Sequence, residues 1–180
     1  STQSGTKMWS FSGDIPRVGF METPFAIRLE DCLTVCGGIQ GGQLKVIQAG
    51  GPLGGLLPPQ SLPTLILEGS SFQPWDSIMG GGGFVFGSDQ TSPLVLAEMF
   101  STFVEEESCG RCTTCHGGNQ RQTEILRRII DGDGRREDEP NLKLIDRTLQ
   151  FSNCVHGQFS PKITRNLLQH FHTEYEAALQ

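Results

Sequence analysis

Residues 108–115 read S-C-G-R-C-T-T-C, and this stretch organises the second half of the chain. Cys109, Cys112 and Cys115 are separated from one another by two residues, and Cys154 follows after 38 intervening residues. A C-x2-C-x2-C run turns three thiols toward one centre, so the fourth corner must come from elsewhere in the chain. Four cysteines are the ligand set of a [4Fe–4S] cluster, in which each iron binds one cysteine thiolate.

A single zinc ion and unmetallated thiols are the alternatives to a cluster. Zinc sites usually draw their thiolates from separated C-x2-C pairs, so three cysteines this tightly spaced fit one tetrahedral ion less well. Six cysteines in 180 residues are too few for a disulfide scaffold, and the run suits a reducing compartment. The sequence therefore favours the cluster.

Charge and glycine divide the chain into two parts. Residues 1–91 hold 11 of the 34 charged residues and 17 of the 23 glycines. Residues 92–180 hold the other 23 charged residues and all four histidines. We therefore predict a loop-rich domain over residues 1–91 and a helical domain over residues 92–180.

The first part alternates apolar and polar residues in short runs, which is typical of strands. Turn residues around Pro16 predict a hairpin, and apolar residues at three- and four-residue steps predict one short helix. Together these elements indicate a small β-grasp-like α+β unit. The predicted strands are residues 7–13, 18–21, 44–49, 64–67 and 83–86, and the predicted helix is residues 28–36.

The second part shows helical periodicity instead. Ser92-Pro93 and Ser160-Pro161 each place a capping residue before a proline at the first helical position. Apolar stripes and short connections predict a four-helix bundle, with the cysteine loop joining the first two helices. The predicted fold class is therefore α+β, with a β-grasp-like domain followed by a four-helix domain. The four helices are predicted to start near residues 92, 119, 140 and 160.

Charge and hydropathy exclude several classes of function. The net charge of −6 is shared evenly by the two parts and no basic stripe is present, which argues against nucleic-acid binding. No apolar run approaches the roughly 20 residues that cross a bilayer, and no signal segment opens the chain. We expect a cytoplasmic protein, or one on a cytoplasm- or matrix-facing arm of a membrane complex, and residues 1–6 read as a linker of a fragment or processed subunit.

Four motifs in a fixed order resemble a known family. They are G-T-K-M-W-S-F-S-G-D (5–14), the glycine run before F-V-F (80–86), E-S-C-G-R-C-T-T-C (107–115) and C-x2-G (154–157). This order resembles the C-terminal part of the NADH-oxidising flavoprotein subunit of respiratory complex I. The same family includes the diaphorase subunit of NAD-reducing hydrogenases and the β-subunit of NAD-dependent formate dehydrogenases.

The resemblance implies a β-grasp, soluble-ligand-binding domain followed by a four-helix domain with one [4Fe–4S] cluster. By motif, its ligands are Cys109, Cys112, Cys115 and Cys154. The implied function is electron transfer within an NAD(H)-dependent oxidoreductase, between FMN held elsewhere and the clusters of partner iron–sulfur subunits. The chain departs from the family pattern around its third cysteine, where a threonine replaces the common preceding proline and His116 replaces the common following arginine.

The flavin and the nicotinamide are expected outside these residues. The sequence has no strand–glycine loop–helix unit to hold their phosphates, so FMN and NADH are expected on a missing segment or another chain, and no catalytic residue is assigned here. The alternative function is an assembly or partner-binding module in which the cluster is only structural, because the cysteine spacing fits both.

Several other residues have a functional and a structural interpretation. Cys32 and Cys36 share a helix face, and buried packing is the commoner role for such thiols. His116 and His156 each lie next to a predicted ligand in the sequence. This position favours a role in tuning the reduction potential of the cluster over a role as a ligand. The glycine runs 50–55 and 80–83 are interpreted as loops of the β-grasp unit rather than as phosphate cradles.

Overall fold

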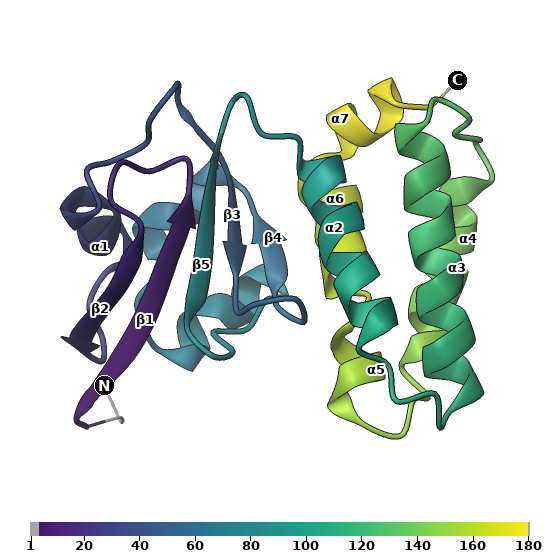
Figure 1. Cartoon of the computed structure of the whole chain (residues 1–180), viewed down its shortest axis with the longest axis horizontal. Helices are drawn as coiled ribbons and strands as arrows, with labels where there is room; N and C mark the ends of the chain where they lie inside the picture. The colour runs from purple at the N-terminus through teal and green to yellow at the C-terminus, as the bar shows by residue number, and fades with distance from the viewer. Residues whose placement is uncertain (1–3, 180) are drawn as a thin grey trace. The chain divides into compact units, whose positions relative to one another are not determined.

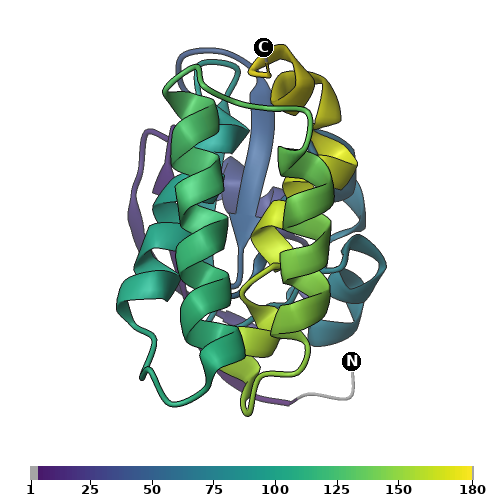
Figure 2. The same ribbon diagram turned by 90° about the vertical axis from the view of Figure 1, so that its right-hand side faces the viewer.

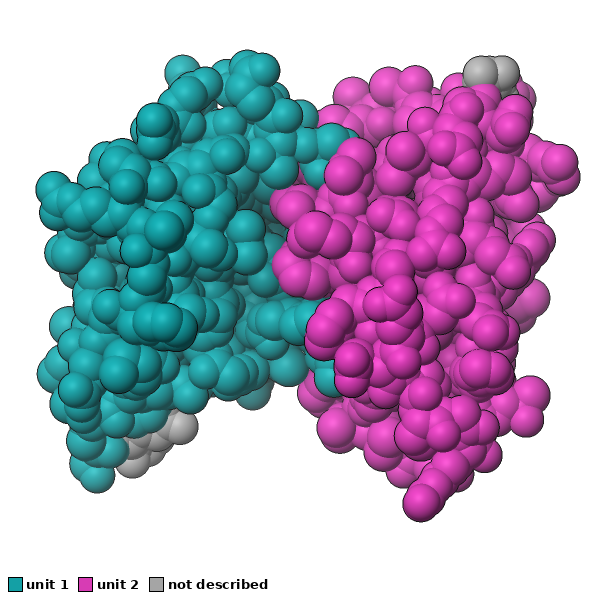
Figure 3. Space-filling model, viewed as in Figure 1, with its two compact units in different colours: residues 1–92 teal, residues 93–180 magenta. Residues whose placement is uncertain are grey.

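The computed structural model describes residues 4–179. The chain divides into two compact units, Ser1–Ser92 and Pro93–Gln180, which are coloured separately in Figure 3. The first unit is built around a β-sheet and the second from helices (Figure 1). The prediction of an α+β fold is confirmed.

Five strands form one mixed sheet in the first unit, in the order β2-β1-β5-β3-β4. The central strands β1 and β5 are parallel, and the other neighbours are antiparallel. Successive side chains of a strand point to opposite faces of the sheet. In β1, Trp9 and Phe11 are accordingly buried, whereas Met8 is exposed. The strands are β1 (Thr6–Gly13), β2 (Gly19–Pro24), β3 (Leu44–Ala49), β4 (Gly55–Leu57) and β5 (Gly83–Ser88).

Helix α1 (Leu29–Val35) contributes to the core of this unit. Its buried residues Leu29, Cys32 and Leu33 belong to the same apolar cluster as Trp9 and Phe11 of the sheet. The three- and four-residue spacing that predicted this helix is therefore the spacing of its buried face.

The segment between β3 and β5 differs from the prediction in two ways. Residues 64–67 form no strand; instead the chain makes two 3₁₀ helices, η1 (Pro59–Thr64) and η2 (Gly69–Trp75), and Ile66 makes only an isolated bridge to Arg28. The prolines of this segment fix φ and remove N–H donors, which disfavours a ladder. The short strand β4 was predicted as loop, because three residues carry no alternation.

Helices of the second unit contact one another in pairs. Helix α2 contacts α3 and α6, and α4 contacts the same two helices. Their apolar faces bury Leu126, Leu142, Leu149 and Leu167. Figure 2 shows α3 and α4 lying alongside each other. The helices are α2 (Pro93–Glu106), α3 (Thr113–Ile130), α4 (Asp138–Leu149), α5 (Val155–Phe159), α6 (Lys162–His170) and α7 (His172–Ala177).

The helix boundaries correct the prediction at three points. The described part of this unit has six helices rather than four, because α5 was missed and the last predicted helix is divided at Phe171, whose φ of −129° and ψ of 32° are not helical. Helix α3 begins at Thr113, six residues before the predicted start. Gly117 and Gly118 concealed its first turns, since glycine is a poor helix former.

A polar chain crosses the core of the helical unit. Gln122 of α3 donates to the hydroxyl of Ser101 on α2 (3.2 Å) and accepts from the hydroxyl of Thr164 on α6 (3.0 Å). All three residues are buried, so their polar groups satisfy one another. None of the helices within residues 4–179 is both long and apolar enough to cross a membrane.

Candidate metal centre

Two segments carry the four predicted ligands. Cys109 and Cys112 lie on the connection between α2 and α3, and Cys112 is the residue that immediately precedes α3. Cys115 lies in the first turn of α3, which corrects the prediction that all three thiols come from one loop. Cys154 immediately precedes α5. In Figures 1 and 2 both segments lie at the same end of the helical unit.

Protein contacts join the two segments directly. The hydroxyls of Thr114 and Ser152 are 3.3 Å apart. The backbone N–H of Asn153 is the main cause that lowers the pKa of the Cys112 thiol, because its hydrogen bond favours the thiolate. Residues 38 positions apart in sequence are thus held together by side chains and backbone of the chain itself.

Gly157 lets α5 approach the third cysteine closely. A Cβ atom at this buried position would lie 2.4 Å from both Cβ and Oγ of Ser152 and 3.0 Å from Cβ of Cys115. Only glycine fits such an approach. The glycine of the C-x2-G motif therefore has a packing role beside the predicted site.

The four thiols differ in exposure. Cys115 is buried, Cys112 is half-buried, and Cys109 and Cys154 are exposed. Burial raises the pKa of the Cys115 thiol; the Ser108 hydroxyl opposes this, and the neighbouring thiols of Cys112 and Cys154 add to it. Negative charge on Cys112 or Cys154 thus disfavours the thiolate of Cys115, and a bound cation would offset this.

These observations fit a cofactor held by several thiolates at the surface of the unit. Within residues 4–179, no group of three or more His, Cys, Asp or Glu side chains is arranged as a metal-ion site as it stands. The ligand set of Cys109, Cys112, Cys115 and Cys154 therefore stays a prediction.

The two histidines beside the cysteines have different surroundings. His156 Nε2 donates to the carbonyl oxygen of Val104 at 2.9 Å, which fastens α5 to α2. His116 is exposed and lies 3.5 Å, ring nitrogen to amide nitrogen, from Gln120 of the same helix. The contact of His156 indicates a structural role.

Cys32 and Cys36 lie in the core of the sheet unit, where they are 1% and 4% exposed. Burial raises the pKa of Cys32 to about 11 and also raises the pKa of Cys36. Thiols this buried and this weakly acidic are poor nucleophiles and poor ligands. Their surroundings favour packing over a second metal site.

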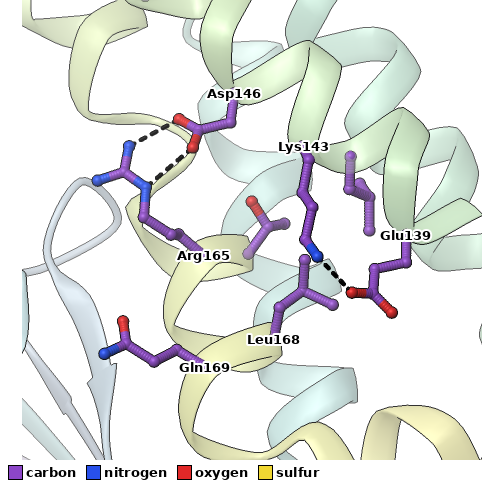
Figure 4. Close-up of a pocket in the computed structure, with 8 residues that line it drawn as sticks. Glu139, Lys143, Asp146, Arg165, Leu168 and Gln169 are labelled. Atoms are coloured by element: carbon purple, nitrogen blue, oxygen red, sulfur yellow. Dashed lines mark hydrogen bonds and ion pairs between the residues drawn. The ribbon is translucent and has the colours of Figure 1, made fainter.

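A separate pocket of about 260 Å³ lies between α4 and α6 (Figure 4). Its charged groups are already paired: Lys143 Nζ lies 2.6 Å from Glu139, and Arg165 makes two hydrogen bonds, of 2.9 and 2.6 Å, to Asp146. No cysteine lines it. The pocket is therefore distinct from the cysteine site and offers no unpaired charge to a ligand.

Comparison with known proteins shows which proteins this chain resembles. Residues 95–178, which include all four predicted ligands, match the NADH-ubiquinone oxidoreductase-F iron-sulfur binding region. The chain is 27% identical to the F subunit of the NADH-quinone oxidoreductase of Rickettsia bellii (strain OSU 85-389), over 98% of this chain and 43% of that protein. This chain is a relative of that oxidoreductase component. The family resemblance predicted from the four motifs is confirmed.

Other relatives are components of hydrogenases. The chain is 36% identical to the NADP-reducing hydrogenase subunit HndC of Solidesulfovibrio fructosivorans, over 98% of this chain and 36% of that protein. It superposes on a chain of the NAD⁺-reducing [NiFe]-hydrogenase in the air-oxidized state with a TM-score of 0.88 and 29% identity, over 100% of this chain and 31% of that chain. The chain thus spans less than half the length of these quinone-oxidoreductase and hydrogenase relatives.

Sequence reasoning missed the small polar residues around the thiols. Ser108 and Asn119 both reach the sulfur of Cys115, and Ser152 joins the two segments. Asn119 had one available signal, because it lies four residues after Cys115 and therefore on the same helix face. That signal depended on starting α3 at Thr113.

Proposed function

We propose that the helical unit holds one [4Fe–4S] cluster through Cys109, Cys112, Cys115 and Cys154. The observation that carries this proposal is the meeting of the two cysteine-bearing segments through the Asn153–Cys112 and Thr114–Ser152 contacts. The match of this region to an iron-sulfur binding region supports it. When bound, the cluster would supply reversible storage of one electron.

The chain would act as the electron-transfer part of a flavoprotein subunit in an NAD(H)-dependent oxidoreductase complex. In this proposal residues 92–180 are the cluster domain, and residues 1–91 are a β-grasp, soluble-ligand-binding domain. FMN and NADH would bind to a further segment or another chain, and iron–sulfur subunits would be the partners. The names of the quinone-oxidoreductase and hydrogenase relatives support this assignment.

The exposure of the four thiols suits this function. Cys115 would anchor the cluster from the protein interior, while Cys109 and Cys154 would leave the opposite side near the surface. The buried side excludes water from one thiolate, and the open side allows a partner's redox centre to approach. A cluster buried on all sides would favour the structural alternative instead.

The test is anaerobic reconstitution of the 180-residue chain with iron and sulfide. We expect close to four irons and four acid-labile sulfides, because four thiolates hold one cubane. Dithionite should bleach the sample reversibly and give a low-temperature paramagnetic signal, whereas NADH alone should not. A colourless protein with one tightly bound zinc would overturn the cluster, and a cluster with no reversible reduction would favour the structural module.

A further inference from the structure

Asn119 is a fully buried amide beside a predicted ligand. Its side-chain nitrogen donates to the sulfur of Cys115 at 3.4 Å, one helical turn away on α3. The same sulfur lies 3.6 Å from the hydroxyl oxygen of Ser108, which comes from the connection between α2 and α3. Asn119 therefore donates to Cys115, and the Ser108 hydroxyl would donate as well once Cys115 is a thiolate, because a thiolate can only accept.

The other half of the Asn119 amide has no partner. Its oxygen Oδ1 is buried and makes no hydrogen bond within the described residues. A buried polar atom without a partner destabilises the fold, and an apolar residue of similar size would remove that cost. Packing alone therefore does not explain an asparagine at this position, whereas a fixed donor to the sulfur does.

We propose that Asn119 and Ser108 are positioning residues that donate N–H···S and O–H···S hydrogen bonds to the Cys115 corner of the cluster and raise its reduction potential. This inference rests on the proposed function. Reduction adds negative charge that spreads onto the ligand sulfurs, so a hydrogen-bond donor stabilises the reduced form more than the oxidised form.

The effect should be concentrated at Cys115 because of its burial. Cys109 and Cys154 are exposed, so water can donate to their sulfurs in any variant. Cys115 is buried. A hydrogen bond in the protein interior is stronger than one in water, and water cannot replace it when the donor is removed. A change at Asn119 should therefore appear in the potential of the cluster.

The experiment compares the reconstituted chain with Asn119→Leu and Ser108→Ala by redox titration, read from the low-temperature paramagnetic signal. We expect each variant to keep its iron and to lower the reduced-to-oxidised ratio at a fixed potential by about three- to tenfold. A tenfold change corresponds to about 59 mV for a one-electron couple. The double variant should show the larger shift.

Thr123→Val is the matched control. Thr123 is also buried on α3, and its hydroxyl donates to the backbone carbonyl of Asn119 rather than to a sulfur. Thr123→Val removes a hydrogen bond of the same helix face, so a shift of the potential caused by disturbing this face should appear in Thr123→Val as well. Only Asn119→Leu should move the potential.

A measurement on the unaltered protein covers the case in which Asn119→Leu does not hold iron. The reduced chain, labelled with ¹⁵N in its asparagine side-chain amides, should show a ¹⁵N coupling to the cluster by electron spin-echo modulation. An unshifted potential in iron-loaded Asn119→Leu, or no ¹⁵N coupling, would overturn the inference while leaving the cluster intact. An unaltered chain that takes up no iron would instead overturn the proposed function.

Discussion

The tightest packing beside the predicted site is at Gly157, and Gly157→Ala tests it. The added methyl would lie 2.4 Å from two atoms of Ser152 and 3.0 Å from Cβ of Cys115. Both neighbours are buried, so α5 must shift to admit it. Overpacking of this kind costs about 1–3 kcal/mol, whereas alanine gains up to about 1 kcal/mol over glycine in a helix. We expect a net destabilisation of about 1–2 kcal/mol.

The two units can be followed separately in one urea titration. Trp9 and Trp75 are the two tryptophans and both lie in the sheet unit, so their fluorescence reports that unit. Circular dichroism at 222 nm reports chiefly the helical unit. Gly157→Ala should lower the urea midpoint of the circular dichroism transition and leave the fluorescence transition unchanged. In a thermal scan, each kcal/mol of destabilisation should lower the melting temperature of the helical unit by about 4–8 °C.

Gly117→Ala is the matched control, because a Cβ there meets nothing within 4 Å. It should stabilise the helical unit by about 0.5–1 kcal/mol, since alanine is the better helix former. Ser152→Gly should restore most of the stability of Gly157→Ala by removing the nearest atoms. A Gly157→Ala protein as stable as Gly117→Ala would refute the close packing of α5 against Cys115.

Three further predictions use other parts of the chain. Cys154→Ala should lose iron, and its melting temperature by circular dichroism should equal that of the iron-free unaltered chain, because cluster binding adds to folding stability. A full iron count in this variant would place the fourth ligand elsewhere. Cys32→Ala and Cys36→Ala should keep their iron and lose about 1 kcal/mol in the tryptophan transition; lost iron would contradict the packing role. The Thr91 hydroxyl and then the Ser88 N–H lower the pKa of Asp14, so the stability that Asp14 contributes is present above its unfolded pKa and is lost as the pH falls through its folded pKa. Asp14→Asn should therefore make the stability of the sheet unit less sensitive to acid below about pH 4. An unchanged acid profile would contradict this.

Strand periodicity predicted much of the sheet unit from sequence. The predicted strand at 44–49 has the bounds of β3, and β1 and β5 lie within two residues of their predicted ends. The two failures are both short-range. Strand β4 has three residues, too few for a period of two, and most of the expected strand at 64–67 lies between the 3₁₀ helices η1 and η2, where Ile66 forms only an isolated bridge.

Cysteine spacing predicts three ligands of the candidate site, the family resemblance implies Cys154 as the fourth, and the set stays a prediction. The spacing could not predict which thiol is buried, because that depends on where α3 begins. A C-x2-C-x2-C run is compatible with a loop or with the start of a helix, and only the second places Cys115 inside the unit. The hydrogen-bond donors Ser108 and Asn119 carry no motif of their own.

The first half of α3 was missed for a physical reason that concerns the site. Its buried residues toward the N-terminus are Cys115, Asn119, Gln122 and Thr123, and apolar burial begins only at Ile125. An apolar stripe therefore detects the second half and not the first. A buried polar face is stable only where it meets polar partners, and here the partners are the sulfur of the predicted ligand and the hydroxyls of α2 and α6. The buried polar face that hid the helix start from periodicity is thus the face that carries the predicted ligand Cys115 and its donor Asn119.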